Sequence, residues 1–154
     1  MIIKKIFIAG LFTLLTVSVQ AQNKGFAIGA QLFSPTGISA KYAISESSSI
    51  TGATSFRLND FNNYITLQGN FILNGSKDQF NIESGLLRSY YGIGLNLIFQ
   101  ERGDASIGFR IPIGVEYALE NQPLEIYMDV APTLSIKPNT MFYFDSSMGV
   151  RYFF

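Results

Sequence analysis

The feature that most constrains this chain is a strict alternation of side chains over its last fourteen residues, which read MFYFDSSMGVRYFF. Counted back from Phe154 in steps of two, five of the next six residues are apolar: Tyr152, Val150, Met148, Ser146, Phe144 and Phe142. The other register is mixed and carries both charges, Asp145 and Arg151. A period of two predicts a β-strand whose faces meet different environments. An apolar face, a polar face and a terminal Phe are typical of the closing strand of an outer-membrane β-barrel.

The N-terminal segment has the features of a secretory signal peptide. Lys4 and Lys5 supply positive charge, and residues 6–19 are apolar or small. The tripeptide Val19-Gln20-Ala21 places small side chains at the −3 and −1 positions of a cleavage site. We therefore expect a cleaved signal peptide, residues 1–21, followed by one barrel domain, residues 22–154. This apolar stretch is too short for a membrane anchor.

Charge and composition narrow the class of protein further. Charged residues make up 14% of the sequence, compared with about 25% in typical soluble domains. Removal of Lys4 and Lys5 leaves nine basic residues of the eleven, against eleven acidic ones. The resulting net charge of −2 gives no reason to expect nucleic acid as a partner. No stretch after residue 21 approaches the roughly 18 apolar residues of a membrane helix.

Alternation and turn residues predict eight strands and no helix. Their ranges are 26–33, 37–44, 49–56, 64–73, 87–99, 106–119, 124–134 and 141–154. The third strand is the weakest, because only Ile50 and Phe56 are bulky. In the unsettled stretch 74–86, Phe80 and Ile82 could extend the fifth strand through a bulge near Gly85. We expect an all-β fold, an eight-stranded antiparallel up-and-down transmembrane β-barrel with short connections and both termini on the periplasmic side.

The placement of charge provides a test of this arrangement. Of the twenty charged residues after residue 21, eight lie within predicted strands, and all eight fall on the register opposite the apolar one. A basic side chain facing lipid at mid-bilayer costs about 2–4 kcal/mol, so this sorting has a physical cause. We call these eight residues the lumen charge network: Lys41, Arg88, Arg110, Glu116, Glu125, Asp129, Asp145 and Arg151.

The network holds four positive and four negative charges. The interior of an eight-stranded barrel is just wide enough to be filled by side chains. Isolated charges there would be expensive and paired charges much less so, so we predict a lumen closed by salt bridges. Strand order indicates that Arg110 pairs with Asp129 or Glu125. It also indicates that Arg151 pairs with Asp145 or Glu125.

Several kinds of chemistry are excluded by what the sequence lacks. It has no His and no Cys, which removes Ser-His-Asp triads, Cys nucleophiles and the usual zinc ligands. Glu125 and Asp129 share a face and could serve acid–base work or a cation site, although lumen ion pairing is the favoured interpretation. Gly92-Ile93-Gly94 resembles part of a dinucleotide-binding fingerprint, but no predicted helix follows it that would hold a phosphate. Pro112 and Pro132 each remove a ladder donor and predict local bulges. We assign no catalytic, cofactor-binding or metal-binding residue and expect no cofactor.

Five segments resemble a family of small, uncharacterised outer-membrane β-barrels that is close in architecture to OmpA and OmpX. They are Ser34–Gly37, Tyr90–Gly94, Gly108–Gly114, Asp129–Pro132 and Gly149–Phe154. The resemblance implies a fold and an outer-membrane location but no activity, so no functional residue is carried over. The predicted external connections are short, unlike the long external strands of OmpX-like adhesins, which argues against adhesion.

Resemblance to this class also gives the last strand a second expected role. Outer-membrane barrels are inserted by an assembly machine that engages a C-terminal strand with a final aromatic residue. The expected C-terminal assembly signal consists of Phe142, Phe144, Met148, Val150, Tyr152 and Phe154. Lipid contact explains the same apolar residues, and both roles can hold.

These observations lead to three hypotheses of function. The first is a closed, monomeric, non-enzymatic barrel of the bacterial outer membrane with a structural or interaction role, surrounded by outer-membrane lipid. The second is a narrow channel or small-ligand carrier in the same membrane. The third is a soluble secreted β-barrel that binds an apolar ligand, in which the apolar register would face inward.

Overall fold

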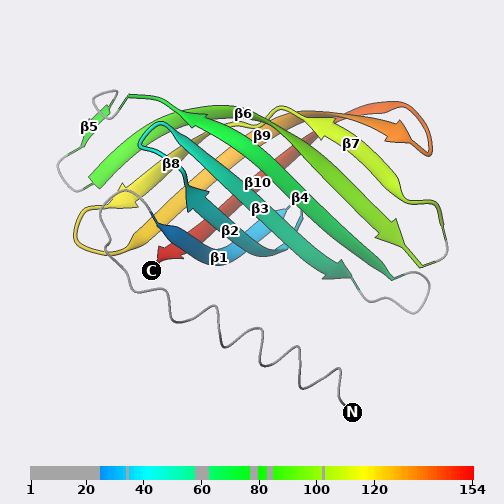
Figure 1. The fold of residues 1–154 in the computed structure, drawn as a ribbon, viewed down its shortest axis with the longest axis horizontal. Helices are drawn as coiled ribbons and strands as arrows, with labels where there is room; N and C mark the ends of the chain where they lie inside the picture. The colour runs from blue at the N-terminus through cyan, green and yellow to red at the C-terminus, as the bar shows by residue number, and fades with distance from the viewer. Residues whose placement is uncertain (1–24, 34, 58–62, 77–79, 83–84, 102) are drawn as a thin grey trace, which may run out of the picture.

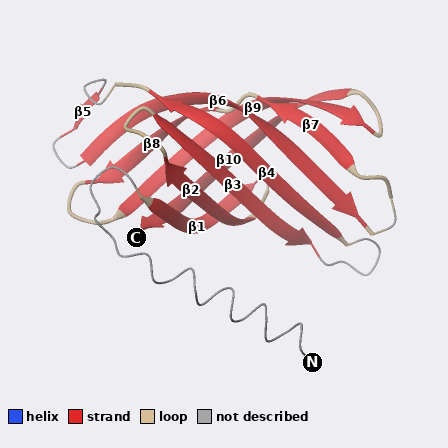
Figure 2. Cartoon of the chain, in the orientation of Figure 1, coloured by secondary structure: helices blue, strands red, loops and turns tan. Residues whose placement is uncertain are grey.

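The computed structural model describes residues 25–33, 35–57, 63–76, 80–82, 85–101 and 103–154. The predicted signal peptide, residues 1–21, lies outside these ranges. All regular secondary structure in the described ranges is β-strand (Figure 2). In those ranges, no helix has the length and apolar character needed to cross a membrane.

The strands form a single antiparallel sheet whose members run obliquely across the molecule (Figure 1). In chain order they are β1 (Phe26–Phe33), β2 (Gly37–Ala43), β3 (Ser48–Arg57), β4 (Tyr64–Asn74), β5 (Phe80–Ile82), β6 (Gly85–Gln100), β7 (Ser106–Arg110), β8 (Ile113–Leu119), β9 (Leu124–Lys137) and β10 (Met141–Phe153). Each long strand pairs with its neighbours in the chain, as an up-and-down topology requires.

The first and last strands close the sheet into a ring. β1 pairs with β10 from Ala27–Phe153 to Phe33–Ser147, and β10 pairs with β9 on its other side. β7 and β8 share one place in the ring, between β6 and β9, and β5 pairs only with β6. The ring therefore has eight strand positions, which confirms the predicted eight-stranded antiparallel barrel.

The predicted sixth strand, 106–119, is divided into β7 and β8 by Ile111 and Pro112. Pro112 has no N–H, so the ladder loses one donor there. Ile111 N–H still donates to the Pro132 carbonyl at 3.1 Å, and Gly92 N–H donates to the Pro112 carbonyl at 2.9 Å. The predicted proline bulges are wrong, because the pairing with β9 keeps one register from Arg110–Thr133 to Ile113–Val130. Pro132 lies within β9, opposite Phe144 on β10. The register shift occurs instead between Ile107 and Gly108.

Within the unsettled stretch 74–86, the described residues 80–82 form the short strand β5. β5 folds back on the start of β6, with Phe80 opposite Leu87 and Ile82 opposite Gly85. The predicted extension of the fifth strand through a bulge is therefore wrong, because these residues run antiparallel to that strand. Arg57 and Lys137, which lie outside the predicted strand ranges 49–56 and 124–134, are the last residues of β3 and β9.

The weakest predicted strand is a full member of the ring. β3 pairs with β2 from Ser49 to Thr54 and with β4 along its whole length.

The wall of the barrel separates two environments. On β4, exposed and buried residues alternate from Ile65 to Leu73, with Ile65 and Phe71 outside and Gln68 and Asn70 inside. The same alternation on the other long strands gives an apolar exterior and a polar interior. The buried core of this molecule is therefore its lumen.

Candidate functional site

The residues of the lumen charge network lie inside the barrel. Six of them are classed as buried: Lys41, Arg110, Glu116, Glu125, Asp145 and Arg151. The side chains of Arg88 and Asp129 are 11% and 7% exposed. Each residue is placed inward by the two-residue period of its strand.

Lys41 on β2 links opposite walls of the lumen. Its Nζ lies 2.5 Å from Glu116 Oε2 on β8 and 2.7 Å from Glu125 Oε2 on β9. β1 and β10 separate β2 from β9 in the ring, so the lysine reaches across the interior to make these contacts. One ammonium group thus bridges two carboxylates in a water-poor interior.

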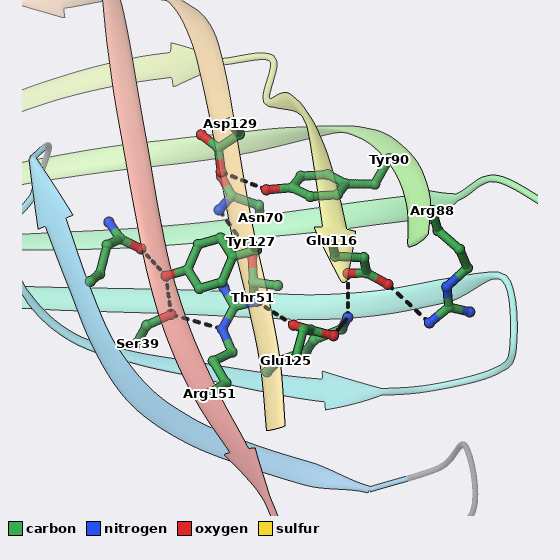
Figure 3. A network of polar contacts seen from close by, with 12 residues as sticks. Ser39, Thr51, Asn70, Arg88, Tyr90, Glu116, Glu125, Tyr127, Asp129 and Arg151 are labelled. Atoms are coloured by element: carbon green, nitrogen blue, oxygen red, sulfur yellow. Dashed lines mark hydrogen bonds and ion pairs between the residues drawn. The ribbon is translucent and has the colours of Figure 1, made fainter. Parts of the chain in front are cut away.

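Two arginines complete this chain of charges. Arg88 is the register partner of Glu116, and its Nη2 lies 3.0 Å from Glu116 Oε1. Arg151 is the register partner of Glu125, and its Nη1 lies 3.0 Å from Glu125 Oε1. Figure 3 shows this row of side chains between the walls. Arg151 therefore pairs with Glu125, which is one of the two partners predicted for it.

A second cluster surrounds Arg110. Its guanidinium lies 3.3 Å from Asp129 Oδ1 and donates to Asn70 Oδ1 at 3.1 Å. Tyr90 donates its hydroxyl proton to Asp129 Oδ2 at 2.8 Å (Figure 3). Arg110 therefore pairs with Asp129, which is one of the two partners predicted for it. Glu125 contacts Lys41 and Arg151 whereas Asp129 contacts Arg110, so the two carboxylates have separate partners.

The remaining network member, Asp145, accepts a hydrogen bond from Thr133 Oγ1 at 2.9 Å. The geometry of the site contains no convergent metal ligands: among the described residues, no three His, Cys, Asp or Glu side chains come together.

Two inward tyrosines belong to the site although our sequence analysis did not select them. The Tyr127 hydroxyl lies 2.7 Å from Gln31 Oε1 and 2.9 Å from Ser39 Oγ, and so connects β9 to β1 and β2. The Arg151 guanidinium stacks 3.6 Å from the centre of the Tyr127 ring. Tyr90 and Tyr127 both lie on the polar register of their strands, and this position in the sequence pattern could have identified them as inward residues.

Glycines opposite these tyrosines make room for the rings. Tyr90 faces Gly114 in the register of β6 and β8, and Tyr127 faces Gly149 in that of β9 and β10. A Cβ atom at Gly114 would lie 2.8 Å from Tyr90 Cζ, and one at Gly149 would lie 2.8 Å from Tyr127 Cε1. Side chains larger than glycine would therefore displace the rings.

The lumen widens at both ends and is nearly filled at its centre. The outer cavity, of about 850 Å³, lies at the end where β1 meets β2 and β9 meets β10. A cavity of about 400 Å³ lies at the opposite end, beside Gly25 and Phe154. The space between them, lined by Tyr90, Arg110 and Asp129 among others, measures about 10 Å³. This is about the volume that one water molecule requires.

The residues of the expected C-terminal assembly signal lie on the outer face. All six are exposed: Phe142, Phe144, Met148, Val150, Tyr152 and Phe154. The Phe142 and Phe144 rings are 5.2 Å apart, and the Tyr152 and Phe154 rings 5.3 Å apart. The Phe154 backbone N–H donates to the Phe26 carbonyl at 3.0 Å, so these residues also lie beside the seam that closes the ring.

An eight-stranded antiparallel ring with an apolar exterior and a polar interior is the architecture of small outer-membrane β-barrels. The chain is similar to the N-terminal β-barrel domain of Pseudomonas aeruginosa OprF, with a TM-score of 0.57 and 12% identity over 88% of this chain and 100% of that chain. It is also similar to Neisserial surface protein A (NspA), with a TM-score of 0.51 and 19% identity over 85% of this chain and 95% of that chain. At these identities the likeness establishes the fold. No family model and no curated protein sequence matches the chain.

Proposed function

We propose that this chain is a closed β-barrel of the bacterial outer membrane with a structural or interaction role and no catalytic activity. The apolar exterior, the likeness to OprF and NspA and the predicted signal peptide support this location. Outer-membrane lipid would surround a monomer, and the barrel-assembly machinery would engage β10. Nucleic acid is not a proposed partner.

The observation that carries the proposal is the contact of Lys41 with Glu116 and Glu125. It spans the lumen between two wider cavities and lies beside the arginines and tyrosines that leave about 10 Å³ at the centre. A hydrated ion would have to separate buried ion pairs to pass, and breaking such pairs is costly. The proposed resting state is therefore non-conducting.

The hypothesis of a soluble secreted barrel conflicts with the direction of the side chains. It requires the apolar register to face inward, whereas Phe109, Ile111 and Val130 are each more than half exposed. Arg110 and Glu125 are at the same time buried in the interior.

Single-channel recording in a planar bilayer tests the closed lumen. We expect the refolded barrel, residues 22–154, to insert without steady conductance. A variant carrying Lys41→Ser and Tyr127→Ala serves as the open control, because it removes the cross-lumen cation and an inward ring. Steady conductance from the unchanged barrel would refute the proposal.

The second candidate, a narrow channel or small-ligand carrier, draws support from the two end cavities of about 850 and 400 Å³. The same recording separates its channel form from the closed barrel. Its ligand-binding form requires a site in one of the cavities.

A further inference from the structure

The outer cavity has the construction of a binding site. Its volume of about 850 Å³ lies within the range of about 300–1,000 Å³ found for small-molecule pockets. The mouth carries the aromatic side chains of Phe33 and Tyr64, and the polar side chains of Gln68, Asn96 and Tyr143 line the cavity further in. The charge network closes the floor, so a ligand would be held there and not passed through.

Asn96 is the polar group of this cavity whose bonding is incomplete. The residue is 5% exposed, and its Oδ1 has no hydrogen-bond partner. Its Nδ2 reaches the Tyr143 hydroxyl only at 3.4 Å. A buried acceptor without a hydrogen-bond partner is energetically unfavourable. Rotation of the amide toward the cavity would let Oδ1 accept a hydrogen bond from a ligand hydroxyl.

The charges around the cavity favour a neutral ligand. Of the described residues that line it, Asp145 is the only charged one, and Thr133 already donates to that carboxylate. The other polar groups are amides and hydroxyls, which both donate and accept hydrogen bonds. The described lining includes no basic side chain that would bind an anion.

We propose that the outer cavity binds a mono- or disaccharide, with Asn96 and Tyr143 as hydrogen-bonding residues. Sugar hydroxyls suit a lining of neutral amides and hydroxyls, and the apolar C–H face of a sugar ring suits the aromatic mouth. The inference extends the small-ligand candidate, and its test can fail separately from that of the closed lumen, because sugar binding and conductance are measured separately.

Nuclear magnetic resonance of the isotope-labelled barrel in lauryldimethylamine oxide micelles provides the test, since this detergent has no sugar headgroup to compete. Maltose is the probe, and spermidine and citrate represent a cation and an anion. We expect saturable shifts of the Gln68 and Asn96 side-chain amides with a dissociation constant of about 1 mM. Neither charged compound should shift these signals.

Asn96→Ala should weaken maltose binding about three- to tenfold, as expected for the loss of one hydrogen bond. Asn74→Ala is the matched control, because Asn74 Oδ1 also lacks a partner but the residue lines the opposite cavity. It should leave the affinity unchanged. If Asn96→Ala fails to fold, Tyr143→Phe replaces it as the test. This variant keeps the ring, removes the hydroxyl and should also weaken maltose binding.

The absence of saturable maltose shifts up to about 50 mM would overturn the inference. So would tighter binding of spermidine than of maltose, or an equal effect of the Asn74 and Asn96 variants.

Discussion

Lys41 joins the two carboxylate–arginine pairs of the lumen. Its ammonium contacts two carboxylates from two other strands, and each carboxylate also contacts an arginine. Removing the lysine would leave Glu116 and Glu125 close together in a water-poor interior. The chain of contacts between β2 and the opposite wall would then be broken.

Lys41→Met should destabilise the barrel by about 3–5 kcal/mol, the usual cost of removing one partner from a buried ion pair. The measurement is urea-induced unfolding in lipid vesicles, followed by the heat-modifiable gel shift. The control is Lys41→Arg, which keeps a cation facing Glu116 and Glu125 and should retain most of the stability. A change below about 1 kcal/mol would show that the lysine is solvated in the folded barrel.

Gly149→Leu should block folding or displace Tyr127, because even a Cβ at this position would lie 2.7 Å from the Tyr127 hydroxyl oxygen. Overpacking of this kind costs about 1–3 kcal/mol or more. Gly69→Leu is the matched control, because a Cβ at Gly69 meets no atom within 4 Å. Equal folded yields of the two variants, measured by gel shift in vesicles, would contradict the described packing.

Side-chain direction could be predicted from the sequence, whereas side-chain partners could be predicted only in part. The two-residue period alone assigns Arg110 and Glu125 to the interior. It does not say that Lys41 reaches across to β8 and β9, because cross-lumen neighbours depend on how the closed ring staggers its strands. The alternation also places Tyr127 inside, but the contacts of Tyr90 and Tyr127 were not predicted, because the room for an inward ring depends on a facing glycine on the paired strand.

Secondary-structure elements were predicted best where alternation is uninterrupted. β1 has its predicted bounds, and β10 ends one residue before the predicted strand. The division between β7 and β8 depends on Pro112, whose effect on register a sequence does not reveal. The strand β5 was missed because three residues carry too short a pattern to distinguish a new strand from an extension.

Phe154→Ser should lower insertion of the barrel into the outer membrane several-fold, if β10 carries the proposed assembly signal. The change removes an outward aromatic ring that packs near Tyr152. Phe153→Ser, on the opposite register, should have a smaller effect. Insertion is measured as heat-modifiable protein in isolated outer membranes. Normal insertion of Phe154→Ser in cells would contradict the signal, and a matching defect in vesicles without the machinery would assign the residue to lipid contact.

At the scale of the whole molecule, one ring places hydrocarbon-compatible side chains outside and ion pairs inside. The ring closure that makes this possible could be anticipated from an even number of alternating strands and a polar inner register. The cavities could not, because their sizes depend on which inward side chains fold toward the centre. Tyr90 and Arg110 fill the middle of the lumen, and the outer cavity remains open.

The most direct test of this inside-out arrangement is analytical ultracentrifugation of refolded residues 22–154 with and without detergent, with circular dichroism on the same samples. We expect folded monomeric barrel in micelles and aggregation on detergent removal, because residues such as Phe144 and Ile93 would face water. A folded, monodisperse β-protein in plain buffer would contradict the account.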